Sequence, residues 1–242
     1  FSTGSNTARS SYNFYALNNG IATLFESRGV GIGKTSFKRR INSGLAVGFS
    51  FLKTAYENSN FIFNQIDIAN TYKNDIVLQH ERSIYTDVIK AIDIESNELI
   101  DFSTTMHSSK DSYAISKRDR PLAYIIKKNN YGFIEKLNDV GVNYVELEKD
   151  TMIYSGGYKV VEFNNKFKVY EKMKMQKVVT SIEYSNNKFS KGDILISMNQ
   201  KRSNLIAELL EPEAPNSYVS FGIIKTSLNN QLPIYRIKNF NN

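Results

Sequence analysis

The residues best suited to chemistry lie between Gly20 and Ser36, where an apolar run leads into a carboxylate, an arginine and a series of glycines. The glycines, followed by Lys34, have the composition of a loop that binds phosphate through its backbone N–H groups. Glu26 instead stands at the end of the apolar run, where a strand would present its carboxylate. These two chemistries are incompatible, so the function depends on which one applies.

The glycine spacing argues against the phosphate chemistry. A P-loop needs a glycine five positions before Gly33, but that position is Arg28, and Gly29 is one residue too close. The dinucleotide fingerprint needs a glycine where Lys34 stands. A tight turn with glycines at positive φ explains the series better. A nucleotide-binding protein acting through Gly29 to Thr35 therefore stays open only as the weaker alternative.

Composition sets the outer limits. The 242 residues carry 31 basic and 24 acidic side chains, a net charge of +7, but the charges are scattered, as in Lys159 to Lys177. Solvated strand faces explain this pattern better than nucleic acid does. The absence of cysteine excludes disulfides, thiolate zinc sites and cysteine nucleophiles. No apolar run approaches the roughly 20 residues of a membrane span. The chain opens on Phe1 without a signal-peptide pattern, which predicts a fragment or processed product.

The elements that must position Glu26 are a strand and the helix after it. We expect a short helix from Tyr12 to Asn18, a strand from Gly20 to Ser27, and a helix from Thr35 or Ser36 that continues or resumes to about Tyr72. Ser36 is a plausible N-cap. Helical spacing relates the apolar residues Phe37, Ile41, Leu45, Phe49 and Leu52. Gly44 and Gly48 would let this helix pack closely on a sheet.

After Asp75 the pattern changes to short alternating runs. It predicts strands at Ile76–Gln79, Ile84–Ile92, Leu99–Met106, Leu122–Lys127, Tyr144–Leu147, Met152–Phe163, Lys166–Lys172, Val178–Tyr184 and Asp193–Ser197. Two helices interrupt them, one from Asn130 to Val140 stopped by Gly141 and one from Ser203 to Glu211 ended by Pro212. We therefore expect two domains, residues 1–75 and an α+β module of residues 76–242.

The segment from Gly20 to Arg40 resembles the final core strand and last helix of the zinc carboxypeptidase family, the carboxypeptidase A-like metallopeptidases. Bacterial members often show Glu-Thr-Arg-Gly-x-Gly where this chain has Glu26-Ser27-Arg28-Gly29-Val30-Gly31. Four later blocks look like the accessory C-terminal region of bacterial members: Arg120–Ile125, Lys191–Met198, Leu209–Ser217 and Pro233–Ile237. The resemblance covers almost the whole chain, and the Leu-Leu-Glu-Pro-Glu sequence that begins at Leu209 is its most specific match.

This resemblance implies an α/β fold in which residues 1–75 are the C-terminal part of an α/β/α mixed-sheet catalytic domain, followed by a smaller strand-rich α+β module. It implies a peptide or peptide-like substrate and an exported or extracytoplasmic location. In the family, zinc held by two histidines and a glutamate polarises a water, and a second glutamate moves the proton to the leaving amine. Glu26 matches that second glutamate. From spacing alone, an ion pair of Glu26 with Arg28 or a helix lysine would be the commoner role.

Phe1, Arg9 and Tyr12 are further candidates for substrate binding. Many family members place a tyrosine some two dozen residues before the catalytic glutamate, to cap the substrate carboxylate, and Phe1 falls in that region. A phenylalanine cannot donate this hydrogen bond. The role would be lost or would pass to Tyr12, Tyr15 or Arg9, whose guanidinium fork suits a carboxylate.

The metal site is where this chain departs from the family. The family's zinc ligands come from a His-x-x-Glu motif and a later histidine, all upstream of the segment matching Phe1. This chain has only His80 and His107, neither at ligand spacing. We therefore expect no metal bound by this chain, and no hydrolysis by it without the missing N-terminal half of the catalytic domain. The alternative is a non-catalytic binding or interaction protein built on a peptidase scaffold.

Overall fold

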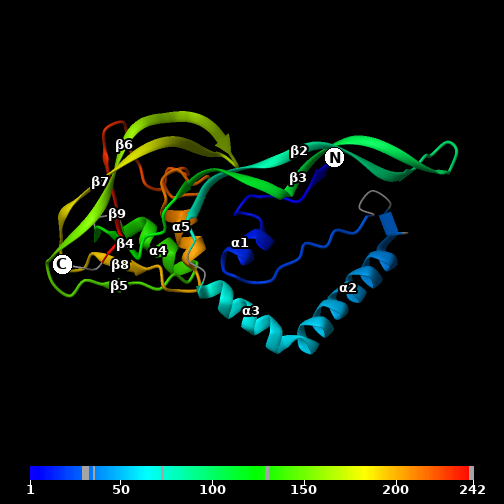
Figure 1. The fold of residues 1–242 in the computed structure, drawn as a ribbon, viewed down its shortest axis with the longest axis horizontal. Coiled ribbons are helices and arrows are strands. Elements are labelled where there is room, and N and C mark those ends of the chain that lie inside the picture. The colour runs from blue at the N-terminus through cyan, green and yellow to red at the C-terminus, as the bar shows by residue number, and fades with distance from the viewer. Residues whose placement is uncertain (29–32, 35, 72–73, 129–130, 240–242) are drawn as a thin grey trace.

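The computed structural model describes residues 1–28, 33–34, 36–71, 74–128 and 131–239 (Figure 1). A long hairpin of β2 (Ile76–Ile92) and β3 (Leu99–Arg118) runs out from a body that contains a second sheet. Helices α2 (Phe37–Glu57) and α3 (Ser59–Thr71) form an angled pair beside this body. The chain is thus a mixture of helices and mainly antiparallel strands. The mixed-sheet arrangement implied for residues 1–75 stays a prediction.

The strand predicted over residues 20–27 is not formed. These residues follow α1 (Ser11–Leu17) as an irregular segment, with Ile21, Leu24 and Phe25 all exposed. A strand persists when a neighbouring strand takes up its backbone N–H and C=O groups. Within the described ranges, no strand pairs with this segment. The apolar run alone was therefore not enough to make a strand.

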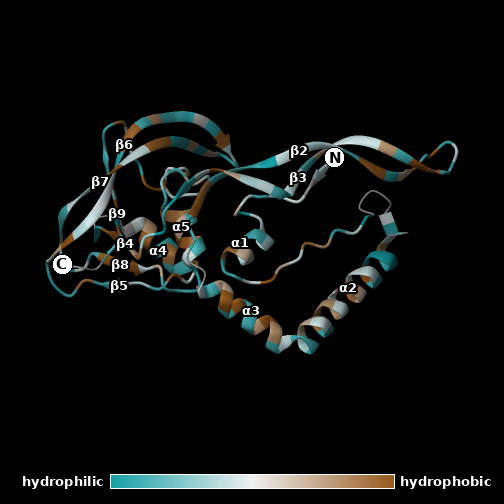
Figure 2. Cartoon of the chain, viewed as in Figure 1, coloured by the Kyte–Doolittle hydropathy of each residue, from teal (hydrophilic) through white to brown (hydrophobic). Residues whose placement is uncertain are grey.

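The helix predicted from Thr35 or Ser36 begins at Phe37 as α2, and α3 continues the helical run. Its apolar face exists, but α2 and α3 have no buried residues. Apolar residues recur along both helices in the colouring of Figure 2. The side chains of α2 are 45–68% exposed at Phe37, Ile41, Leu45, Phe49 and Leu52. The packing predicted at Gly44 and Gly48 is absent, because no described atom lies within 4 Å of a Cβ built at either position. Ser36 occupies the N-cap position as predicted, but its side chain makes no capping hydrogen bond, and its hydroxyl donates to the Gly33 carbonyl at 3.2 Å.

The hairpin joins two strands that the sequence predicted as shorter pieces. Its antiparallel register runs from Ile76 opposite Arg118 to Ile92 opposite Leu99, with irregularities between Val77 and Ser83. A two-residue strand, β1 (Ser2–Thr3), pairs in parallel with β3. These three strands form the first sheet, in the order β1-β3-β2. The N-terminal segment is therefore attached to the hairpin.

The second sheet has six strands in the order β5-β8-β4-β9-β6-β7, all paired antiparallel. Its members are β4 (Ala123–Ile126), β5 (Val145–Glu146), β6 (Thr151–Tyr170), β7 (Met173–Phe189), β8 (Ile194–Ser197) and β9 (Gln231–Ile237). Every predicted run of residues 122–197 contributes to it. No strand was predicted over the β9 residues, although β9 pairs with both β4 and β6.

The core lies on both faces of this sheet. Tyr124 and Ile126 of β4 face the larger apolar cluster, which includes Leu137 of α4 (Tyr131–Asp139) and Leu210 of α5 (Ser203–Leu210). The alternate residues Ala123 and Ile125 face a smaller cluster, as the period of two in a strand requires. Both helices match their predictions. Gly141 has φ +67°, and the Val142 N–H bonds to the Leu137 carbonyl at 2.9 Å, a C-terminal cap at α4.

The Glu-Pro-Glu sequence after α5 forms a buried polar network. Glu211, fully buried, accepts hydrogen bonds from the Tyr124 hydroxyl and from Arg118 at 2.5 Å, and lies 3.7 Å from Arg236. Glu213 accepts from Arg118 at 2.9 Å and from the Thr180 N–H at 2.8 Å. Burial opposes the charge of Arg118, but the two glutamates raise its pKa overall. The network ties β3, β4, β7 and β9 to the end of α5, so this block is structural.

Candidate functional site

Glu26 lies exposed on the irregular segment between α1 and α2. At the end of this segment the Arg28 carbonyl accepts a hydrogen bond from the Arg39 guanidinium at 3.2 Å, which connects the segment to α2. An apolar groove of about 570 Å³ opens between α1, residues 21–25 and α2. Tyr12 and Tyr15 line this groove, and the Tyr12 hydroxyl donates to the Ser5 carbonyl at 3.2 Å. The catalytic role of Glu26 and the substrate-binding role of Tyr12 stay predictions.

Arg9 belongs to the first region of the chain, residues 1–71, and contacts the second region, residues 76–239. Its guanidinium lies 4.6 Å from the centre of the Tyr170 ring and 4.9 Å from that of Phe221, and it pairs with Glu171. Cation–π contacts of this kind stabilise an arginine against an aromatic surface. Residues 5–9 are therefore held against the turn between β6 and β7. The guanidinium fork that was predicted to bind a substrate carboxylate here engages a carboxylate of the chain itself.

Phe1 lies directly before β1 and is hydrogen-bonded to β3 of the first sheet. Its carbonyl accepts a hydrogen bond from the His107 N–H at 2.8 Å, and its side chain is 63% exposed. Arg9 lines one cavity, Tyr12 lines the apolar groove, and neither Glu26 nor Phe1 lines either of them. The four predicted site residues thus do not converge on one cavity of the described structure.

The structure describes the two histidines of the metal hypothesis, but it does not describe most residues of the nucleotide hypothesis. His80 is in β2 and His107 in β3. Within the part of the chain that the structure describes, no group of three His, Cys, Asp or Glu side chains could hold a metal ion. Residues 29–32 and 35 of the nucleotide hypothesis lie outside the described residues. Gly33 has φ +62°, the positive value that the tight-turn interpretation requires.

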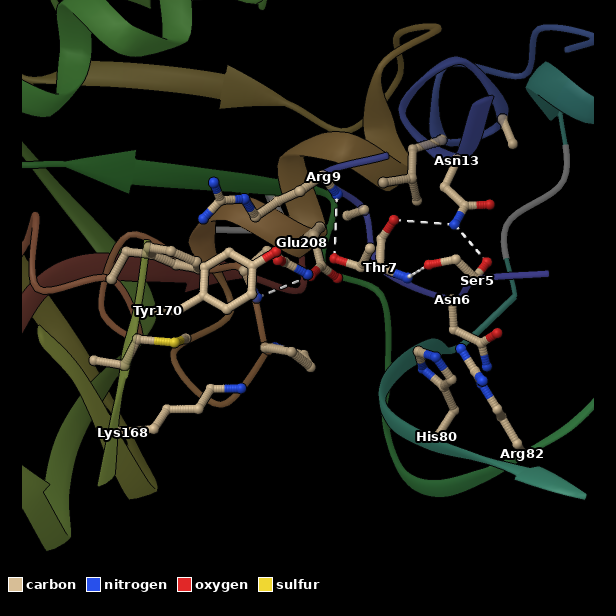
Figure 3. A pocket seen from close by; sticks show the side chains of 17 residues that line it. Ser5, Asn6, Thr7, Arg9, Asn13, His80, Arg82, Lys168, Tyr170 and Glu208 are labelled. Atoms are coloured by element: carbon tan, nitrogen blue, oxygen red, sulfur yellow. Dashed lines mark hydrogen bonds between the residues drawn. The ribbon is translucent and has the colours of Figure 1, made fainter. Parts of the chain in front are cut away.

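A cavity of about 670 Å³ lies where the N-terminal segment meets the second region (Figure 3). Its walls come from residues 5–17, from β2, from the ends of β6 and β7, from α5 and from residues 215–221. Glu208 of α5 lines it, and one of its carboxylate oxygens, Oε1, accepts hydrogen bonds from the Asn216 backbone at 3.1 Å and side chain at 2.8 Å. Burial raises the pKa of Glu208 against the opposing effect of these bonds.

Sequence reasoning found only Arg9 among the charged residues of this cavity. His80, Arg82, Lys168 and Glu208 come from β2, β6 and α5, which are far apart in the sequence. None of them stands in a motif. They come together because the hairpins β2–β3 and β6–β7 are long, and the local sequence pattern did not predict the lengths of these strands.

The comparisons with known proteins point to carboxypeptidases. The chain is 30% identical over 235 residues to carboxypeptidase 2 of Trichophyton equinum, which covers 93% of this chain and 43% of that protein. It is 29% identical over 230 residues to carboxypeptidase 2 of Trichophyton tonsurans, with the same coverage. It is 28% identical over 208 residues to a probable carboxypeptidase 2 of Arthroderma benhamiae, covering 82% of this chain and 39% of that protein.

The chain spans less than half the length of these curated relatives. No protein-family model matches it, and neither does any solved structure. The relatives are fungal and do not support the expected bacterial type. Among the described helices, none is both long and apolar enough to cross a membrane. Over most of its length the chain is therefore similar to proteins named carboxypeptidase 2.

Proposed function

We propose that residues 1–242 are the C-terminal portion of a zinc-dependent metallocarboxypeptidase that hydrolyses peptide or amide bonds, with Glu26 as general acid and base. The observation that carries the proposal is similarity over 93% of the chain to proteins named carboxypeptidase 2. The Glu26-Ser27-Arg28 sequence, which lies between α1 and α2, supports the choice of residue. We further propose, from the family resemblance, a peptide substrate and an exported protein.

Glu26 would transfer a proton from the attacking water to the leaving group. Its carboxylate would take a proton from the attacking water and deliver it to the leaving amine, a contribution of about 10²–10⁴-fold in general acid–base catalysis. The described residues do not fit a zinc site, so the metal would have to be held by polypeptide outside these 242 residues. In this proposal the chain alone is inactive, and the module of residues 76–242 supports or shapes the substrate site.

The exposed apolar surface of the first region is consistent with this proposal. Helices α2 and α3 bury no residue, and residues 21–25 lie unpaired. Contiguous exposed apolar surface is typical of sites that bind another protein, a membrane or a ligand. We propose that the missing part of the catalytic domain packs here, and that residues 20–27 then pair as the strand that the sequence predicts.

Release of a C-terminal amino acid from a synthetic peptide tests the proposal. A protein of the relatives' length that includes this chain should release the residue, lose activity with a zinc chelator and regain it with added zinc. The 242-residue chain alone should release none. Activity that survives removal of zinc, or activity of the chain alone, would contradict the proposal.

The nucleotide alternative has its own test. A ligand at 100 times its dissociation constant stabilises a folded protein by about 2.7 kcal/mol. We expect ATP with magnesium to leave the thermal midpoint of the chain unchanged. A clear upward shift would favour nucleotide binding through residues 29–35.

A further inference from the structure

The cavity between the N-terminal segment and the second region has positive charge at both ends (Figure 3). Lys168 and Tyr170 stand at one side, His80 and Arg82 at the other, and Glu208 lies between them. Arg82 donates to the Ser2 hydroxyl at 2.8 Å and to the Gly4 carbonyl at 3.4 Å, both neutral groups. These bonds orient the guanidinium and leave its positive charge in place. A ligand spanning the cavity therefore meets a cation at each end.

The cavity also presents hydrogen-bond acceptors. The Asn13 amide nitrogen is used by the carbonyls of Ser5 and Thr7, at 2.6 and 3.0 Å, so its oxygen is the group left to accept a bond. Asn216 donates twice to Oε1 of Glu208, which leaves Oε2 as the acceptor. These oxygens suit the N–H groups of a peptide backbone.

The cavity also has the size and apolar surface that a ligand of several groups needs. Its volume of about 670 Å³ falls within the range of about 300–1,000 Å³ of small-ligand sites. Leu17, Met175 and Phe221 supply apolar lining. Three of the lining residues are lysine or arginine and one is glutamate. Together with the net charge of +7, this balance attracts acidic partners.

We propose that this cavity binds an acidic peptide segment, with carboxylates at the two cationic ends and backbone N–H groups on the acceptors that line it. Two separated cations select a ligand with two anionic groups over a single inorganic anion. The acceptors select a ligand with N–H donors. The site goes beyond the proposed hydrolysis, because it needs neither Glu26 nor a metal and is complete in this chain.

Fluorescence anisotropy of a labelled tetraglutamate peptide, titrated with the 242-residue chain, tests the proposal. Arg82→Gln and Lys168→Gln remove one cation at each end, and each should weaken binding about tenfold, as loss of a charge-assisted hydrogen bond does. Lys90→Gln is the matched control, since it removes the same charge from the exposed Lys90–Asp101 pair of the β2–β3 hairpin. It should bind like the parent chain.

Tetraglutamine tests whether the charge of the peptide is needed, and inorganic phosphate tests whether a single anion is enough. A tetraglutamine peptide that binds as tightly as tetraglutamate would overturn the proposal, and so would equal weakening by Lys90→Gln. Phosphate that binds as tightly as the peptide would also overturn it, because a single anion would then suffice. Circular dichroism checks folding. If Arg82→Gln lowers the thermal midpoint, the binding of Lys168→Gln is the test: weaker binding supports the proposal and parental binding overturns it.

Discussion

Residues 1–71 and residues 76–239 both carry amphipathic helices, but only the second region buries them. Leu137 of α4 is fully buried, whereas Leu45 of α2 is 54% exposed. Among the described residues before Ile76, only the polar Asn18 and Ser36 are buried, while the apolar core begins at Ile76. Periodicity therefore specifies the helix in both regions. Burial depends on a second surface, which the module supplies from its own sheet.

The contrast bears on function through Glu26. In the module, buried residues hold one another in place, as Glu211 does with Arg118 and Tyr124. Glu26 has no comparable surroundings in the described chain. The relatives are more than twice as long as this chain. The exposure of Glu26 is then explained if the proposed catalytic residue gains its environment from polypeptide outside these 242 residues.

The largest expected effect comes from breaking the buried network of the module. Glu211→Ala leaves Tyr124 and Arg236 without its carboxylate, and removal of one partner from a buried ion pair costs about 3–5 kcal/mol. Glu57→Ala is the control in the first region, where the pair with Lys53 is exposed at 3.8 Å and such pairs contribute at most about 1 kcal/mol. Urea unfolding followed by circular dichroism measures both. Equal losses would remove the distinction between the regions.

A matched pair of apolar truncations sharpens the comparison next. Leu137→Ala should lower the free energy of unfolding by about 2–5 kcal/mol, because it leaves a cavity in the core. Leu45→Ala should change it by less than about 0.5 kcal/mol, as exposed substitutions usually do. Both sites are helical, so helix propensity changes alike. A large loss from Leu45→Ala would show that α2 is packed in solution.

The smallest effect concerns pH. The pKa of Glu208 is raised above 4.5 in the folded chain, mainly by burial, so the folded state keeps this proton to higher pH than the unfolded state. Its stabilising contribution is therefore full at low pH and is lost as pH rises through the folded pKa. Glu208→Gln, which retains an acceptor for Asn216, should raise the unfolding free energy at pH 7 and leave it nearly unchanged at pH 4. Glu135→Gln on the exposed side of α4 is the control. A loss of stability at pH 7 would contradict this assignment.

The sequence predicted elements well where neighbouring segments share one core. Both module helices and the predicted strand positions after residue 75 were confirmed, although β9 was not predicted. Gly141 caps α4 at a positive φ, which glycine adopts without strain. The long continuous hairpins were predicted as shorter strands because polar breaks interrupt the alternation. The prediction of a strand over residues 20–27 failed for a different reason. A strand needs a neighbouring strand to pair with, and the local sequence does not show whether one is present.

The candidate site was less predictable than the fold. Glu26 came from a family resemblance, and no spacing argument within the chain identifies it. The charged cavity joins Arg82, Lys168 and Glu208 through tertiary structure alone. Leu209–Ser217, singled out as the most specific resemblance, contributes to the stability of the module through Glu211 and Glu213.

The most direct test of the central claim is the turnover of Glu26→Gln in a protein of the relatives' length. The substitution keeps the shape of the side chain and removes its basicity, so kcat should fall by about 10²–10⁴-fold while the bound zinc stays at the parent level. Glu57→Gln, an exposed glutamate of α2 in the same region, should retain parental kcat. Parental kcat in Glu26→Gln would contradict the assignment of Glu26 as general acid and base.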